Sequence, residues 1–234
     1  KNQQFSAQTL ARQNIVKLVN KIKEVVYLLE SAFKWIENIS SSALEVCDGM
    51  GSYKVFNKMT DCKITLEKFG EVELCNYINL NESDKLQALN MRNHIRIKKW
   101  MHNQGSISEE DHFGFIENLE IDTVRRYFLI KQKDNIIGSI NFSKINFENS
   151  LELGIYTNPF FQIKDAGRLL ESAASQYAFI EIGVKKIKLE VYSDNERAVN
   201  FYKKCDFNLI NTKKANHQNI MYMEKIKVLE GVSE

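Results

Sequence analysis

The sequence has few of the features that mark membrane proteins or secreted proteins. No stretch of its 234 residues comes near the roughly 20 consecutive apolar residues that a membrane helix requires. The polar start, "KNQQFSAQ", has no hydrophobic segment of the kind found in signal peptides. We therefore expect a globular chain with a cytoplasmic location and no membrane partner.

Cysteine spacing and net charge exclude further classes of protein. The four cysteines form no C-x-x-C pair and no zinc-ligand spacing with histidine, so neither a disulfide scaffold nor a metal cofactor is expected. The 32 basic and 30 acidic residues give a formal net charge of +2, without a run of like charges. We expect no nucleic-acid partner, and any anionic ligand must be bound by a local group of cations.

The chain is long enough for one substantial core and a small appendage. Apolar positions from about Leu10 to Ile39 suit an amphipathic helix. The helical pattern ends before Met59, where "ALEVCDGMGSYKVFNKM" contains two glycines. We predict a mainly helical N-terminal extension over residues 1–58, one domain over 59–228 and a C-terminal tail over 229–234.

Strand and helix patterns alternate within the predicted domain. "CKITLEKFGEVELCNY" alternates like a strand, one helix is expected to start near Asn81 to Ser83, and Ser108 with Asp111 has the spacing of a capping box for another. Two apolar runs around "KQKDN" predict a hairpin, and "SLELGIYTNP" predicts a strand that ends at Pro159, the only proline. "VKKIKLEVY" and the closing "FNLINTKK" and "NIMYMEKIKV" are further strands.

The helix expected from Asp165 carries an apolar stripe at helical spacing. Its members are Leu169, Leu170, Ala173, Ala174, Tyr177 and Ala178. The order of elements predicts an α/β (α+β) domain with a mixed central sheet flanked by helices.

A first candidate site is the junction "TNPFFQIKDAGRLL". A helix N-terminus with Gly167, Lys164 and Arg168 could hold a phosphate through free backbone N–H groups and local cations. The alternative is an ordinary connection in which Asp165 caps the helix.

A second candidate is "SDNERAVNFYKKCDF", from Ser193 to Phe207. Asn195 and Tyr202 share one helical face, and the tyrosine hydroxyl could carry chemistry. The alternative is that Ser193 and Glu196 form a capping box and that Tyr202 only packs on the sheet.

A third candidate is the polar segment that contains Arg92, His94, His102 and His112. Basic and aromatic residues mixed there, Trp100 and Phe115 among them, would suit stacking and phosphate contacts to a nucleotide. The alternative is a solvated pair of helices.

These three features, in this order, resemble the GNAT superfamily of N-acetyltransferases over about Cys62 to Lys227. The family's motif N-x-x-A-x-x-x-Y stands here as "NERAVNFY", and its Q/R-x-x-G-x-G/A motif has Gln162 and Gly167 in register but Asp165 in place of the first glycine. The resemblance implies the family fold with acetyl-CoA as co-substrate. The implied cofactor-binding residues are Ile155, Tyr156, Gln162, Gly167, Arg168 and Asn195.

A finer resemblance is to the acetyltransferases of pseudaminic acid biosynthesis, which act on a UDP-linked 4-amino-4,6-dideoxysugar. It lies in "MRNH", "WMH", "DHFGFIENL", "ELGIYTNPF" and "LEVYSDNERAVNFY". It implies that the substrate is a UDP-aminosugar for flagellin glycosylation. The implied substrate-binding residues are Arg92, His112 and Phe115 for the UDP part, with Met101 and Tyr156 for the sugar.

By the same resemblance Tyr202 would be the general acid, and Glu190 and Asn141 would hold a water that accepts the amine proton. Attack would be direct, so Cys205 would not be a nucleophile. Rival functions are acetylation of a protein N-terminus or another small amine, and a non-catalytic domain that binds acyl-CoA.

Residues 1–58 give a weaker resemblance, in which "ALEVCDGMGSYKVFNKM" resembles the C-terminal end of the UDP-sugar hydrolase of the same pathway. A fusion to, or association with, that hydrolase would follow from it, and a homodimer is a further expectation about partners.

Overall fold

The computed structural model describes residues 11–12, 24–25, 61–146, 149–215 and 218–227. The chain divides into two compact units, Lys1–Val55 and Phe56–Glu234, and the account below concerns the second. Residues 11–12 and 24–25 are helical. The rest of the expected extension, its resemblance to a hydrolase, the boundary at residue 59 and the tail over 229–234 lie outside the described residues.

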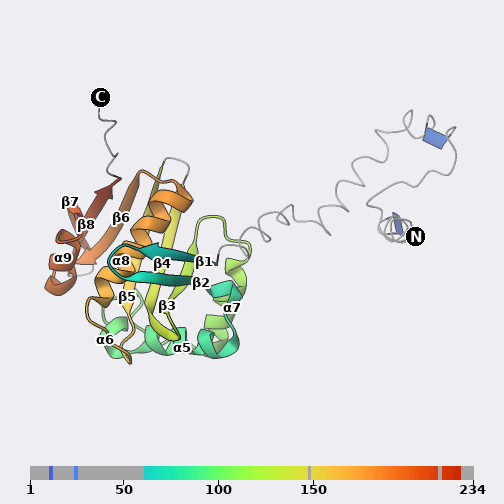
Figure 1. Cartoon of the computed structure of the whole chain (residues 1–234), viewed down its shortest axis with the longest axis horizontal. Coiled ribbons are helices and arrows are strands. Elements are labelled where there is room, and N and C mark those ends of the chain that lie inside the picture. Colours follow the sequence, from blue (N-terminus) through green and yellow to red (C-terminus); the bar gives the residue numbers. More distant parts are fainter. Residues whose placement is uncertain (1–10, 13–23, 26–60, 147–148, 216–217, 228–234) are drawn as a thin grey trace. The chain divides into compact units, whose positions relative to one another are not determined.

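The second unit is built on an eight-stranded sheet in the order β1-β2-β3-β4-β5-β6-β8-β7 (Figure 1). Its strands are β1 Cys62–Leu66, β2 Gly70–Asn76, β3 Arg126–Gln132, β4 Asn135–Asn146, β5 Ser150–Thr157, β6 Lys186–Tyr192, β7 Asn208–Ala215 and β8 Gln218–Ile226. Only β5 and β6 pair in parallel, and the other neighbours are antiparallel. The predicted mixed sheet with flanking helices is confirmed.

The helices lie in two groups along the chain. Between β2 and β3 come η1 Tyr77–Asn79, α5 Glu82–Asn93, α6 Ile95–Lys98 and α7 Glu109–Leu119. After β5 come α8 Ala166–Gln176 and its continuation η2 Tyr177–Ile182, and after β6 comes α9 Glu196–Lys203.

The two groups of helices cover opposite faces of the sheet. Strand β3 shows this, since successive residues of a strand point to opposite sides. Phe128 and Ile130 of β3 belong to the apolar cluster that contains the α8 stripe. Leu129, between them, belongs to the cluster formed with η1, α5 and α7. All three side chains are fully buried, which explains the uninterrupted apolar run in β3.

The predicted helix boundaries are mostly confirmed. Asn81 caps α5, and Ser108 caps α7, with Asp111 N donating to Ser108 Oγ over 3.1 Å. The Asp111 carboxylate accepts from Ser108 Oγ over 2.7 Å, in place of the backbone N–H that a capping box uses. The α8 stripe is buried as predicted, and Tyr177 stacks on Phe142 with ring centroids 5.6 Å apart.

Two predictions of local structure are wrong. The segment read as a first strand is a hairpin, because Gly70 has φ 74° and turns the chain between β1 and β2. The capping box expected from Ser193 and Glu196 does not form. Asn195 caps α9 instead, and Ser193 Oγ donates to Asp194 Oδ1.

Candidate active site

A cleft of about 820 Å³ opens where β5 and β6 separate. The two strands pair only over Ser150–Glu152 and Lys186–Lys188. Beyond those residues, the cleft is lined by Leu153–Thr157 on one side and by Glu190, Val191 and Tyr192 on the other. A strand edge beside an open space can bind an extended ligand as an added strand.

The β5 side of the cleft is shaped by a close fit between Gly154 and Asn141. The two residues are partners across β4 and β5, and a Cβ on Gly154 would lie 2.4 Å from Asn141 Oδ1. Glycine therefore lets the Asn141 amide lie over the strand. Both residues line the cleft.

The loop before α8 forms one end of the cleft. Asn158 is buried and holds this loop, since its Nδ2 donates to Ile136 O over 2.8 Å and its Oδ1 accepts from Phe160 N over 2.9 Å. At its end Asp165 occupies the N-cap position in the left-handed region with φ 58°, and its side chain makes no capping hydrogen bond. Asp165 therefore stands at the expected N-cap position, but its side chain does not make the expected capping hydrogen bond.

Gly167, in the first turn of α8, packs closely on α9. A Cβ there would lie 3.2 Å from Phe201 Cε2, so the Phe201 ring would have to move by a few tenths of an ångström. Gly167 and the neighbouring Gln162 and Arg168 line the cleft, as does the N-terminal end of α8, whose free backbone N–H groups suit a phosphate.

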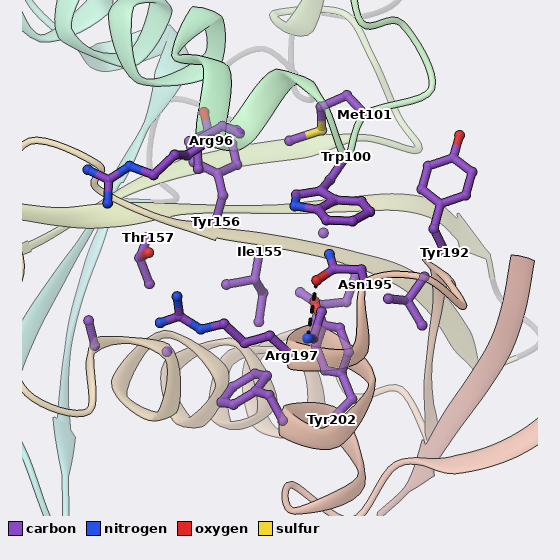
Figure 2. Close-up of a pocket in the computed structure, with 18 of the residues that line it drawn as sticks. Arg96, Trp100, Met101, Ile155, Tyr156, Thr157, Tyr192, Asn195, Arg197 and Tyr202 are labelled. Carbon is purple, nitrogen blue, oxygen red and sulfur yellow. Dashed lines mark hydrogen bonds between the residues drawn. The ribbon is translucent and has the colours of Figure 1, made fainter. Parts of the chain in front are cut away.

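Asn195 lies where β6 leads into α9. Its Oδ1 accepts a hydrogen bond from Ala198 N over 3.3 Å, shown as a dashed line in Figure 2. The residue also lines the cleft, so the donor N–H groups of the same amide are available to a ligand.

Tyr202 lies deep in the cleft wall, on the same side as Asn195 (Figure 2). Its side chain is buried, with the Phe207 ring centroid 5.5 Å from its own. Burial, with smaller contributions from Cys205 and Glu171, raises the pKa of the Tyr202 phenol well above its ordinary value. The hydroxyl is therefore protonated at neutral pH.

Cys205 is buried three residues further on and is not among the residues that line the cleft. Burial raises the pKa of its thiol to about 11, with a smaller contribution from Glu171. A thiol in this state is not a nucleophile at neutral pH.

Glu190 lies at the opposite side of the cleft from β5 and is held by His102. His102 Nε2 lies 3.3 Å from Glu190 Oε2, and the hydroxyl of Tyr192 lies 3.4 Å from His102 Nδ1. Together they join the segment after α6 to β6. The position of His102 beside the Glu190 carboxylate was not predicted from the sequence.

The predicted cofactor and catalytic residues come together in this cleft. Its lining includes Asn141, Ile155, Tyr156, Gln162, Gly167, Arg168, Glu190, Asn195 and Tyr202, along with Met101 from the predicted sugar site. Figure 2 shows Met101 and Trp100 across the cleft from Tyr202. These residues come from β4, β5, β6, α8, α9 and the segment after α6, which only the fold brings together.

Arg92, His112 and Phe115, predicted to contact UDP, do not line this cleft. His112 is buried, with Nε2 lying 3.0 Å from Lys85 O, and this burial lowers the pKa of its imidazole. Phe115 packs edge to face on Tyr127, with ring centroids 5.0 Å apart.

Arg92 is joined to the cleft by Tyr156. Its Nη2 donates to Asn103 O over 2.7 Å, whereas Nη1 is buried and has no hydrogen-bond partner among the described residues. The Tyr156 hydroxyl lies 3.2 Å from the Tyr77 hydroxyl and near enough to Arg92 to interact with its charge. Tyr156, which lines the cleft, therefore also lies near Arg92.

The structure adds cleft residues that sequence reasoning missed. Arg96, Arg197 and Lys204 line the cleft, and the first two point into it (Figure 2). Arg197 lies within the motif "NERAVNFY", so the sequence pointed to its place near the cofactor. No sequence motif pointed to Arg96.

No cluster of three metal-ligating side chains occurs in the described part of the chain. None of the described helices has the length and apolar character needed to cross a membrane.

The cleft fits a long, anionic thioester. It offers a strand edge for an extended chain, a helix N-terminus with arginines for phosphates and a buried phenol between them. Among the side chains that line the cleft, cations outnumber carboxylates. The cations are Arg96, Arg168, Arg197 and Lys204, and the carboxylates are Asp165 and Glu190. The local positive charge contrasts with a net charge of only +2 for the whole chain.

Comparisons with known proteins agree with this geometry. The model of the acetyltransferase (GNAT) family matches residues 90–207. Acetyltransferase PseH of Campylobacter jejuni subsp. jejuni serotype O:2 is 33% identical over 138 residues, covering 59% of this chain and 85% of PseH. The spermidine N(1)-acetyltransferase of Vibrio cholerae is 33% identical over 88 residues, covering 37% of this chain and 51% of that enzyme.

Solved structures show the same fold. The crystal structure of Campylobacter jejuni PseH in complex with acetyl coenzyme A matches with a TM-score of 0.55 and 25% identity, over 67% of this chain and 99% of that one. The Vibrio cholerae spermidine N-acetyltransferase with CoA and spermine matches with a TM-score of 0.58 and 24% identity, over 66% and 95%.

Proposed function

This chain belongs to the GNAT acetyltransferase family and is an N-acetyltransferase, and on that premise we propose that its acceptor is the 4-amino group of a UDP-linked amino-deoxysugar. The donor is acetyl-CoA. The reaction would be a step of pseudaminic acid biosynthesis, which supplies sugars for flagellin glycosylation. The similarity to PseH over 85% of that protein supports this acceptor.

The single observation that carries the proposal is the state of Arg92. Its buried Nη1 has no protein partner among the described residues, and an unpaired buried charged donor is costly. A uracil carbonyl or a phosphate oxygen would satisfy it. We assign Arg92 and Phe115 to the UDP part. The predicted contact of His112 with UDP is not part of this proposal, because the imidazole is buried with its Nε2 3.0 Å from Lys85 O.

The amino-sugar would then lie between the Arg92 region and the cleft. Met101 and Tyr156, which line the cleft from the segment after α6 and from β5, would contact the amino-sugar. Tyr156 would contact the sugar on one side and the cofactor on the other, because it belongs to both regions.

The residues of the cleft would hold acetyl-CoA along β5. A backbone N–H near Ile155 or Tyr156 would polarise the thioester carbonyl. Gln162, Gly167, Arg168 and the α8 N-terminus would bind the diphosphate, and Asn195 would bind the pantetheine amides through its donor N–H groups.

The proton transfers then balance. The neutral amine attacks the thioester carbon, the new C–N bond replaces the C–S bond, and the amine loses one proton to a water held by Glu190 and Asn141. Tyr202 donates its proton to the departing sulfur and regains one from solvent. No acyl-enzyme forms, in keeping with the raised pKa of the Cys205 thiol.

The test of the acceptor uses UDP itself. Isothermal titration calorimetry should detect UDP binding to the protein, and Arg92→Ala should weaken it by about 10-fold, the usual value of one charge-assisted hydrogen bond. Lys98→Gln removes a cation whose Nζ already donates to Ser106 Oγ over 3.1 Å, and it should leave UDP binding unchanged. The absence of UDP binding by the wild-type protein would contradict a UDP-sugar acceptor.

A second acceptor class, a small polyamine, is favoured by the similarity to the spermidine acetyltransferase. The two classes differ in charge, since a polyamine site needs carboxylates whereas a UDP site needs cations and aromatic rings. Thiol release from acetyl-CoA, measured with the aminosugar nucleotide and with spermidine in parallel, separates them.

A further inference from the structure

The loop that precedes α8 is attached to α6, which belongs to the acceptor half of the domain. Arg96 Nη2 donates to Pro159 O over 2.8 Å. The His94 ring, at the N-cap of α6, packs edge to face on Phe160 with ring centroids 5.1 Å apart. Two side chains from the acceptor half therefore fix the same short loop.

This loop also contains a charge that opposes its expected ligand. Asp165 has an exposed carboxylate that lines the cleft and does not cap α8. A carboxylate beside the helix N-terminus competes with a phosphate for the same N–H groups and repels it. Further cations that reach this end of the cleft would offset the repulsion.

The available cations converge on this end of the cleft. Figure 2 shows the guanidinium groups of Arg96 and Arg197 reaching from opposite sides of the cleft toward Thr157, at its end. Both residues line the cleft, one from α6 and the other from α9. Arg96 gives one N–H to Pro159 O, and a guanidinium has four more donors in a planar fork that suits phosphate oxygens.

We propose that Arg96 binds the diphosphate of coenzyme A from the acceptor half of the domain and offsets the negative charge of Asp165. Arg197 faces the same group from α9. The hydrogen bond to Pro159 O orients the Arg96 side chain before the ligand arrives, which reduces the entropy lost on binding. This assignment concerns the cofactor only and holds whichever amine is the acceptor.

The test is a binding measurement with cofactor fragments. Calorimetry or competition gives the dissociation constants of coenzyme A, of dephospho-coenzyme A, which keeps the diphosphate but lacks the 3′-phosphate, and of pantetheine, which has no phosphate. Arg96→Gln should weaken both nucleotides by about 10-fold and leave pantetheine unchanged. Arg96→Lys keeps the charge but loses the fork, and should fall between. Lys98→Gln, a matched loss of charge in α6, should bind all three like the wild type.

Asp165→Asn tests the second half of the proposal. Asparagine tolerates the same left-handed backbone, so the loop is kept while the charge is removed. Coenzyme A should bind about 3-fold more tightly, and the double variant with Arg96→Gln should recover part of the lost affinity. An equal loss with pantetheine would assign Arg96 to loop structure, and a loss confined to coenzyme A would assign it to the 3′-phosphate. Either result overturns the proposal, as does unchanged affinity for coenzyme A.

Discussion

Burial of the Tyr202 ring keeps its hydroxyl protonated, because the charged phenolate is poorly solvated in the cleft wall. One side chain can therefore serve both as a core aromatic and as a proton donor, and the two interpretations of this residue are compatible.

Tyr202→Phe tests the proton donor at the residue scale. It keeps the ring and its packing, so the KM for acetyl-CoA should change little, while kcat should fall by on the order of 100-fold or more. Steady-state thiol release measures both constants. Tyr177→Phe is the matched control, because Tyr177 is a buried tyrosine outside the cleft lining and its loss of a hydroxyl should leave kcat unchanged. Equal turnover by wild type and Tyr202→Phe would leave the hydroxyl without a role.

At the scale of elements, the cleft depends on how closely β4, β5 and α8 pack. Gly138 of β4 lies where β5 and α8 meet, and a Cβ there would lie 2.4 Å from Tyr156 O and 2.7 Å from Leu170 Cδ1. The first of these atoms belongs to the backbone of β5, the strand that lines the cleft. The missing side chain at this position therefore lets the elements approach.

Gly138→Ala should consequently destabilise the domain by about 1–3 kcal/mol, the usual cost of overpacking. It should also shift β5 and so raise the KM for acetyl-CoA. Denaturant unfolding gives the free energy and kinetics gives the KM. Gly114→Ala is the control, since a Cβ there meets no atom within 4 Å and α7 should gain slightly in helix propensity. If the Gly138→Ala variant had the same free energy of unfolding as the wild type, β5 would be able to move aside for the added methyl group without loss of stability.

At the scale of the whole molecule, buried ionisable groups link stability to pH. His112 is buried under α5, with Lys85 O as partner of its Nε2 and the Lys85 cation nearby. Burial is the main cause that lowers the pKa of this imidazole below its ordinary 6.5. In the unfolded chain the imidazole takes up a proton near its ordinary value, so the unfolded state binds more protons below it.

Stability should therefore fall as the pH drops through about 6.5 toward the lowered value in the fold. His112→Gln keeps a donor for Lys85 O and cannot titrate, so its midpoint temperature should depend less on pH between about 7 and 5. Thermal unfolding at a series of pH values measures this. Identical slopes for the variant and the wild type would mean that other groups carry the acid sensitivity.

Local patterns in the sequence determined most elements of this protein and pointed to several of the residues that line the cleft. The α8 stripe, the start of α7 at Ser108 and the hairpin at "KQKDN" depend on neighbours a few residues apart, and the structure confirms them. Asp206, just after α9, has a left-handed backbone with φ 65°, a conformation that aspartate tolerates at a helix end. The motif around Asn195 and Tyr202 could be recognised because family motifs are themselves short.

Only the tertiary structure decided which of these residues meet. The contact of His102 with Glu190 joins residues 88 positions apart, and the hydrogen bond from Arg96 to Pro159 O joins residues 63 positions apart. The cleft itself exists because β5 and β6 stop pairing after their first residues. Such contacts follow from sheet order and helix packing and leave no periodic trace in the chain. The buried place of His112, beside a cleft that it does not line, was decided in the same way.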